Sequence, residues 1–219
     1  MINKQDVPAI LNSWGSEVAN PAVFMYAHQD DDTLTFGAEI EAHKAAGRYV
    51  IAVLVTDGRN SATRGITGLS VKDFVQARNL EMLNALADLG VDEVHMMGAV
   101  DGALTQNQSD AIVTYWYQRY PSGSFKVPSD QDNNADHQKI GASWRKIKNQ
   151  VPASDVRFYI KPEQRASFPG ARVTQGGWGA IAAASEYRYV DHDNGRYGIG
   201  YLSVPFDYDN FQPISTWHF

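Results

Sequence analysis

The segment VFMYAHQDDDTL (residues 23–34) passes directly from an apolar run into a histidine and three consecutive aspartates. The apolar run has the length and character of a β-strand that is covered on both faces. Three adjacent carboxylates repel one another and are costly to hold beside an apolar core unless a cation neutralises them. A metal ion bound together with the histidine would neutralise them. Alternatively, the aspartates cap the next helix, where acidic residues suit the positive end of the helix dipole.

Strand-like and helix-like segments alternate along the rest of the chain. The expected strands are 22–27, 49–56, 91–98 and 156–161, and the main expected helices are 35–48, 70–90, 109–120 and 136–150. This alternation favours parallel strands joined by right-handed crossovers, with helices on both faces of the sheet. We therefore expect an α/β, Rossmann-like three-layer αβα fold, with one domain over residues 1–219. A short helix over 5–18 should precede it, and the tail over 176–219 should form a hairpin or a sheet-edge extension.

The composition restricts the classes of function. The 219 residues are 43% hydrophobic, which allows one sizeable core, and the net charge of −6 argues against a nucleic-acid partner. The absence of cysteine excludes disulfides and thiolate metal sites. The chain starts without a signal-like apolar run and has no stretch of about 18 apolar residues, so we expect a cytoplasmic protein with no membrane partner. The sequence does not indicate whether the chain forms a homo-oligomer.

Polar side chains follow each of the first three expected strands. Residues 28–32 follow the first strand, Asp57 and Arg59 follow the second, and Asp101 follows the third. In an open α/β sheet, ligands bind outside the carboxyl ends of the strands, near the point where the strand order reverses. Asp57, Arg59 and Asp101 are therefore candidates for lining a binding pocket. They are equally well explained as turn formers, which is the usual role of Asp-Gly.

Two of the six histidines stand out as metal ligands. His28 and Asp31 are three residues apart, so a helix starting directly after the strand would place both on one face. A third ligand must come from elsewhere, and His137 opens an expected helix after a polar loop. His43 and His95 lie within an expected helix and an expected strand, where ordinary structural roles explain them better. Each short motif is ambiguous by itself.

The two motifs together resemble a known family. AHQDDD (27–32) after the first strand and NADH (134–137) at a helix start are similar to the motifs Ala-His-Pro-Asp-Asp-Glu and His-x-Asp-His. These motifs belong to the zinc-dependent de-N-acetylases of the N-acetylglucosaminyl-phosphatidylinositol type, also called PIG-L or LmbE-like proteins. TDGRN (56–60) and LADLGVDEVHMMGAVDG (86–102) are similar to the family's middle section. The resemblance covers about residues 22–145 and leaves the tail uncovered.

The resemblance implies a division of roles that spacing alone leaves open. It makes His28, Asp31 and His137 the metal ligands and Asp30 the general base. Two imidazoles and one carboxylate leave coordination positions open for water, as in a catalytic zinc site. The same ligands also suit ferrous iron, so Zn²⁺ is expected and Fe²⁺ is the alternative.

Two further residues have a substrate-binding role implied by the resemblance. Arg78 would contact a substrate hydroxyl, although an ordinary helix-surface ion pair with Glu81 explains it equally well. Asn134 replaces the family's histidine, which helps to stabilise the tetrahedral intermediate or to protonate the leaving amine. An asparagine can donate a hydrogen bond to an oxyanion but cannot titrate. We therefore expect the tail to fold back over the carboxyl edge of the sheet, with His192 or His218 as the replacement proton donor.

The expected function is a deacetylase that removes an N-acyl group from a small molecule. Metal-activated water would attack the amide of an N-acetylated amino sugar or related conjugate, with an aspartate as general base. The alternatives are a metal hydrolase of the same fold that acts on a non-sugar amide, and a weakened or inactive relative used for binding. A nucleotide-binding module is disfavoured because three aspartates stand where a glycine-rich phosphate loop would be needed.

Overall fold

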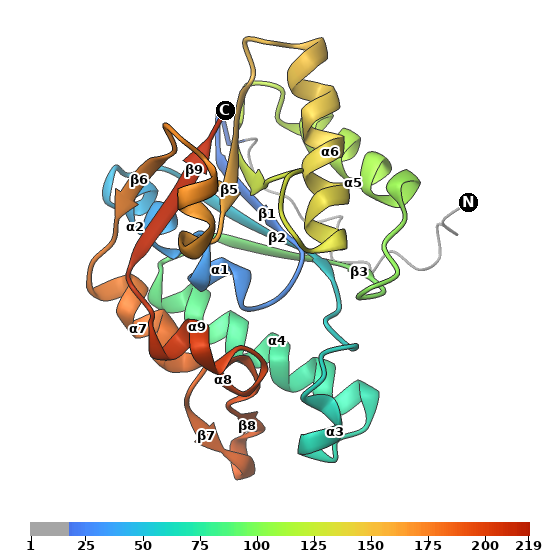
Figure 1. Cartoon of the computed structure of the whole chain (residues 1–219), viewed down its shortest axis with the longest axis vertical. Helices are drawn as coiled ribbons and strands as arrows, with labels where there is room; N and C mark the ends of the chain where they lie inside the picture. Colours follow the sequence, from blue (N-terminus) through green and yellow to red (C-terminus); the bar gives the residue numbers. More distant parts are fainter. Residues whose placement is uncertain (1–17) are drawn as a thin grey trace.

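A seven-stranded sheet forms the centre of the computed structural model, which describes residues 18–219. The strand order is β3-β2-β1-β4-β5-β9-β6 (Figure 1). The strands are β1 Ala22–Tyr26, β2 Val50–Thr56, β3 Glu93–Ala99, β4 Ser124–Pro128, β5 Asp155–Ile160, β6 Arg172–Gln175 and β9 Ile214–His218. The helix expected over 5–18 lies almost wholly outside the described residues.

The first five strands are parallel, and the chain reverses direction only at the edge formed by its C-terminal part. β9 pairs antiparallel with both β5 and β6. A separate two-stranded hairpin forms from β7 (Val190–Asp191) and β8 (Arg196–Tyr197). The Rossmann-like expectation is confirmed, and the tail provides both a sheet extension and a hairpin.

One strand was missing from the sequence-based prediction. β4, with the sequence SFKVP, is wholly buried between β1 and β5, so the segment expected as the fourth strand is the fifth. Its short length, its terminal proline and its central lysine hide the apolar pattern of a buried strand. Lys126 is fully buried with its Nζ 3.7 Å from Asp155 Oδ2, and burial lowers the pKa of this lysine to about 8.

Helices cover both faces of the sheet. Val23 and Met25 pack into one core with α5 (Gln106–Arg119) and α6 (Ala135–Gln150). Alternate residues of β1 pack into a second core with α2 (Gly37–Ala45), α4 (Val71–Asp88) and α7 (Trp178–Glu186). Figure 1 shows these two groups of helices on opposite sides of the sheet. The shorter elements are α1 Asp31–Leu34, α3 Arg64–Thr67, η2 Pro162–Ser167, η3 His192–Asn194, α8 Ile199–Ser203 and α9 Pro205–Asp209.

Two carboxylates, of Glu81 and Glu41, attach the tail to the rest of the molecule. Glu81 of α4 is fully buried and accepts the backbone N–H groups of Ile199 (2.8 Å) and Gly200 (3.0 Å) at the start of α8. Glu41 of α2 accepts the N–H of Gly177 (2.6 Å) at the start of α7. Helix N-termini have unpaired N–H groups, and carboxylates satisfy them. Within residues 18–219, no helix has both the length and the apolar character needed to cross a membrane.

Candidate active site

The loop after β1 turns sharply so that a carboxylate folds back over it. Asp31, the first residue of α1, accepts the backbone N–H of His28 on its Oδ2 at 2.9 Å. His137 lies in the first turn of α6, where the Asn134 side chain caps the helix by accepting the N–H of Asp136 and His137. Because β1 and β4 are neighbours on either side of the reversal in strand order, their loops meet at the edge where ligands bind in such sheets.

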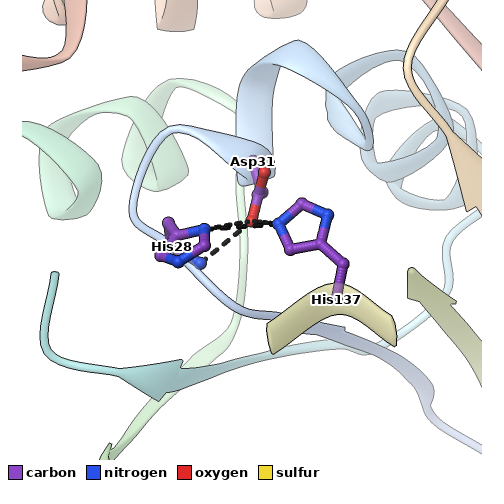
Figure 2. Close-up of side chains that lie close together, drawn as sticks. All are labelled: His28, Asp31 and His137. Carbon is purple, nitrogen blue, oxygen red and sulfur yellow. Dashed lines mark hydrogen bonds and ion pairs between the residues drawn. The ribbon is translucent and has the colours of Figure 1, made fainter. Parts of the chain in front are cut away.

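The three expected metal ligands converge on one point. His137 Nε2 lies 3.0 Å from Asp31 Oδ2, and His28 Nδ1 lies 3.6 Å from the same oxygen. The two imidazole nitrogens are 3.2 Å apart. Figure 2 shows both rings directed toward the Asp31 carboxylate. All three side chains are largely buried, at 14% exposure or less.

Carboxylates hold the outer nitrogens of both rings, and of these only Asp101 was a candidate site residue in the sequence analysis. His28 Nε2 lies 3.2 Å from Asp101 Oδ1 and 3.8 Å from Asp136 Oδ2. His137 Nδ1 lies 3.2 Å from Asp132 Oδ2. A carboxylate that accepts one ring N–H fixes the tautomer and leaves the other nitrogen free to bind a metal. The inner pair, His28 Nδ1 and His137 Nε2, is therefore the pair prepared for coordination.

The inner atoms fit a zinc-sized ion. Zinc bonds of about 2.0–2.1 Å with tetrahedral angles place ligand atoms about 3.3 Å apart, close to the separations observed here. Two lone pairs facing each other repel, and so do two imidazolium ions, whereas a cation between them satisfies both rings. A second group, His28 with Asp101 and Asp136, is also compact. Its carboxylates accept backbone N–H groups from Asn60 and Gly102, which suits an orienting role.

The charges of the site raise the pKa values of both histidines and lower the pKa of Asp31. Burial lowers the pKa of His137, but Asp31 and Asp132 outweigh it and raise the pKa to about 9. Burial likewise lowers the pKa of His28, while Asp101, Asp136 and Asp31 raise it well above its usual range. Burial raises the pKa of Asp31, yet the facing rings hold it well below the ordinary value. The pocket therefore favours positive charge between ionised carboxylates.

Arg78 is paired with Asp30 and not with Glu81. Its Nη2 lies 3.3 Å from Asp30 Oδ2, and its Nη1 donates to the carbonyl of Gly58 at 2.9 Å. Arg78 is 3% exposed, so the helix-surface ion pair is excluded. Gly58 has φ +68°, and a Cβ there would lie 2.7 Å from Arg78 Nη1. The β2 loop thus needs glycine to let the guanidinium reach the Asp30 carboxylate.

The remaining candidates on the β2 and β3 loops fix those loops as well as facing the site. Asp57 accepts the N–H groups of Arg59 (3.1 Å) and Asp101 (3.3 Å), and it pairs with the Arg59 side chain. Arg59 keeps 40% of its side chain exposed. Asp101 accepts hydrogen bonds from the backbone and side-chain N–H groups of Asn60 in the β2 loop, and it also holds His28. Turn formation and placement near the site are therefore combined here.

The tail meets the loop between β1 and α1 through a tyrosine. The Tyr187 hydroxyl is hydrogen-bonded to Asp32 Oδ1 at 2.8 Å and donates to the carbonyl of Gln29. His218 Nε2 lies 2.9 Å from Ser129 Oγ, and His192 stacks on Tyr197 in the hairpin. Within residues 18–219, neither His192 nor His218 forms a hydrogen bond or an ion pair with His28, Asp31 or His137.

Sequence reasoning missed Asp132, Asp136 and Tyr187 for different reasons. Asp136 stands directly before His137, and the Asp-His pair was the available signal for it. Asp132 lies in a polar loop whose composition resembles any surface turn. Tyr187 reaches Gln29 and Asp32 from more than 150 residues away, so no local pattern indicates the contact.

Comparisons with known proteins place this geometry in context. Residues 23–148 match the family described as PIG-L, GlcNAc-PI de-N-acetylase. The chain is 33% identical over 108 residues to a 1D-myo-inositol 2-acetamido-2-deoxy-alpha-D-glucopyranoside deacetylase of Mycolicibacterium vanbaalenii. That match covers 47% of this chain and 38% of the relative, so less than half of either protein is aligned.

Solved structures share the fold at low sequence identity. N,N'-diacetylchitobiose deacetylase from Pyrococcus horikoshii superposes with a TM-score of 0.60 at 14% identity, covering 91% of this chain and 83% of that one. The zinc-inhibited form of teicoplanin deacetylase Orf2 gives 0.63 at 14% identity, covering 90% and 97%. The 4-carboxy-2-hydroxymuconate hydratase GalB of Pseudomonas putida gives 0.61 at 15% identity, covering 90% and 96%.

The structural likenesses concern the fold alone, and the hydratase shows that this fold also occurs in a protein with a different reaction. The family match is more specific, since it spans over half of the chain and contains both histidine-bearing loops. The resemblance seen in the sequence is thereby confirmed: the chain belongs to the PIG-L family of GlcNAc-PI de-N-acetylases.

Proposed function

We propose that this protein is a metal-dependent hydrolase that removes the N-acetyl group from an amino sugar or a related small conjugate. The observation that carries the proposal is the convergence of His28 Nδ1, His137 Nε2 and Asp31 Oδ2, with the outer ring nitrogens held by carboxylates. The names of the curated relative and of several structural neighbours describe deacetylases and support it. Zn²⁺ is the proposed metal, and Fe²⁺ is the alternative that the same ligands allow.

In this proposal, His28, Asp31 and His137 hold the ion. A bound zinc ion lowers the pKa of a water molecule and polarises the amide carbonyl. Asp101 and Asp136 orient the His28 ring, and Asp132 orients the His137 ring, so both lone pairs stay directed at the ion.

Asp30 is the proposed general base. Its carboxylate lies one residue before the ligand Asp31 and is fixed by the buried Arg78. Asp30 takes a proton as water adds to the carbonyl carbon, and the C–N bond then breaks to give acetate and an amine. The same proton can be returned from Asp30 to the leaving nitrogen. This route needs no titrating group at position 134, where the family has histidine.

The other candidates are proposed to contact the substrate. Arg59 and Asp101 lie on the loops after β2 and β3 and offer a donor and an acceptor for sugar hydroxyls. Asn134 is exposed, and its Oδ1 is engaged by the α6 cap. Its amide N–H₂ group remains available as a donor to the developing oxyanion. We further propose that residues 1–219 act as a single domain.

The experiment is a screen of N-acetylated amino sugars and their conjugates that follows acetate release by zinc-loaded protein. The expected result is release with at least one amino-sugar substrate, and release that is slower by about a hundredfold or more after the substitution Asp30→Asn. Acetate release from non-sugar amides alone would transfer the proposal to that substrate class. Metal binding without any acetate release would support the binding relative and contradict the deacetylase.

A further inference from the structure

A cavity of about 330 Å³ lies beside the metal-binding loop and has no assigned role. Its walls come from Leu34 of α1, from Lys161 and η2 after β5, and from residues 206–214 of the tail. Its volume falls at the small end of the range for ligand pockets. It is a separate space from the cavity of about 380 Å³ that Trp217 and Phe219 line.

The position of the cavity relative to the site follows from two residues. Leu34 is three residues after Asp31 in α1, and residues three apart lie on the same face of a helix. Lys161 follows β5 directly and pairs with Asp207 of α9 at 3.0 Å. Burial lowers the pKa of Lys161, but Asp207 raises it, and the charges of Asp31 and Asp30 add to that rise. The cavity wall therefore lies within electrostatic reach of the metal-binding loop.

The two sides of the site differ in chemistry. The loops after β2 and β3 carry Asp57, Arg59 and Asp101, which suit sugar hydroxyls. The cavity on the β5 side is lined by the apolar side chains of Leu34, Phe206, Phe211 and Ile214, and polar side chains such as Lys161 and Asp207, which pair with each other, also border it. Phe206 is 73% exposed, so it is free to cover a ligand that enters the cavity. An apolar group on the substrate gains free energy when it covers these apolar side chains.

We propose that this cavity, called the acyl pocket below, receives the acyl chain of the amide and that the protein accepts N-acyl groups longer than acetyl. The inference rests on the proposed function, because it names the part of the substrate that the site holds on its β5 side. The acyl chain is bonded directly to the reacting carbonyl carbon. The acyl chain therefore starts beside the proposed metal site and extends toward the cavity wall formed by Leu34, one helical turn after Asp31. The sugar then faces the polar loops after β2 and β3.

The test measures binding without turnover. Calorimetry on the zinc-loaded Asp30→Asn protein compares N-acetylglucosamine with N-hexanoylglucosamine. The expected result is that the hexanoyl compound binds roughly tenfold tighter or more, since four additional CH₂ groups are removed from water. Gln212→Trp, which fills the acyl pocket from an exposed position, should reduce that preference to about twofold or less. Phe206→Ala should reduce it partly.

The matched control is Phe219→Ala, which removes an aromatic ring of similar exposure from the other cavity. It should leave the preference for the hexanoyl compound unchanged. Equal binding of the two compounds, or a preference that survives Gln212→Trp, would overturn the proposal. So would a gain found only for octyl glycosides of N-acetylglucosamine, which would assign the acyl pocket to the aglycone. Acetate release by the wild-type protein tests the proposed function separately, so failure of the acyl pocket can be distinguished from failure of the proposed function.

Discussion

Residues 22–148 and the tail (176–219) contribute to the same site in different ways. The first region supplies the three proposed metal ligands His28, Asp31 and His137, the paired Asp30 and Arg78, and the carboxylates behind both imidazoles. The tail supplies none of these. It instead holds the loop between β1 and α1 from behind, through the Tyr187 hydroxyl. Short local motifs thus contain the proposed metal ligands and general base, whereas a contact between distant parts of the chain holds their loop in place.

The attachment of the tail explains how residues far away in the sequence can hold the loop between β1 and α1. Glu81 binds the first N–H groups of α8, and Tyr187 then contacts the loop that carries the ligands. A Cβ on Gly200 would lie 2.3 Å from the Tyr187 ring, so the close approach of α8 requires glycine. A contact of this kind leaves almost no trace in a sequence pattern, because it depends on backbone groups and on one tyrosine among eleven.

The largest expected effect separates two neighbouring aspartates of the first region. Asp30→Asn should keep the metal and lower turnover by about a hundredfold or more, because the general base is removed. Asp31→Asn should instead weaken metal binding itself. Metal content and turnover are measured on the same preparations, and a reversed pair of phenotypes would exchange the two roles.

The second prediction tests the tail. Tyr187→Phe should lower metal affinity by roughly tenfold, the lower end of the effect of losing a group that positions a ligand. Metal affinity is measured by competition with a chelating dye. Tyr208→Phe is the matched control, because the Tyr208 hydroxyl is buried in the same aromatic cluster and has no hydrogen-bond partner among residues 18–219. Equal metal affinity in both variants would show that the tail does not support the loop.

The third prediction concerns pH and the metal-free protein. The pKa of His137 is about 9 in the folded state, against about 6.5 for an ordinary histidine. Between these values the folded state holds a proton that the unfolded state releases, so the free energy of unfolding falls as pH rises. The melting temperature of chelator-treated protein should decrease from pH 6 to pH 9 more steeply than that of His137→Gln. Parallel curves would contradict the ion-pair environment described for His137.

The sequence predicted the fold well wherever strands were long and apolar. β1 and β2 are wholly buried, and their unbroken apolar runs indicated this directly. β4 was not predicted, because one of its buried residues is Lys126. The Lys126 ammonium group is hydrogen-bonded to Ser124 and lies beside the Asp155 carboxylate. A lysine at the centre of a five-residue segment normally indicates an exposed position. Only the pairing of β4 with β1 and β5 shows that this strand lies inside the sheet.

The site was predicted in part for a similar reason. His28, Asp31 and His137 stand in recognisable local motifs, and the structure brings all three together. For Arg78 the sequence left open a substrate contact and a surface ion pair with Glu81, and the pair with Asp30 was not predicted, because a helix pattern does not tell a buried guanidinium from a surface one. Asp132 was not recognised, since its role depends on the direction of a ring in α6.

The central claim is that the inner nitrogens of His28 and His137 and the Asp31 carboxylate hold one metal ion. The most direct test is elemental analysis of protein purified with and without added zinc, for the wild type and for His137→Ala. We predict about one ion per chain in the wild type and little or none in His137→Ala, with chelation removing activity. Full occupancy in His137→Ala would exclude His137 from the site and contradict the account.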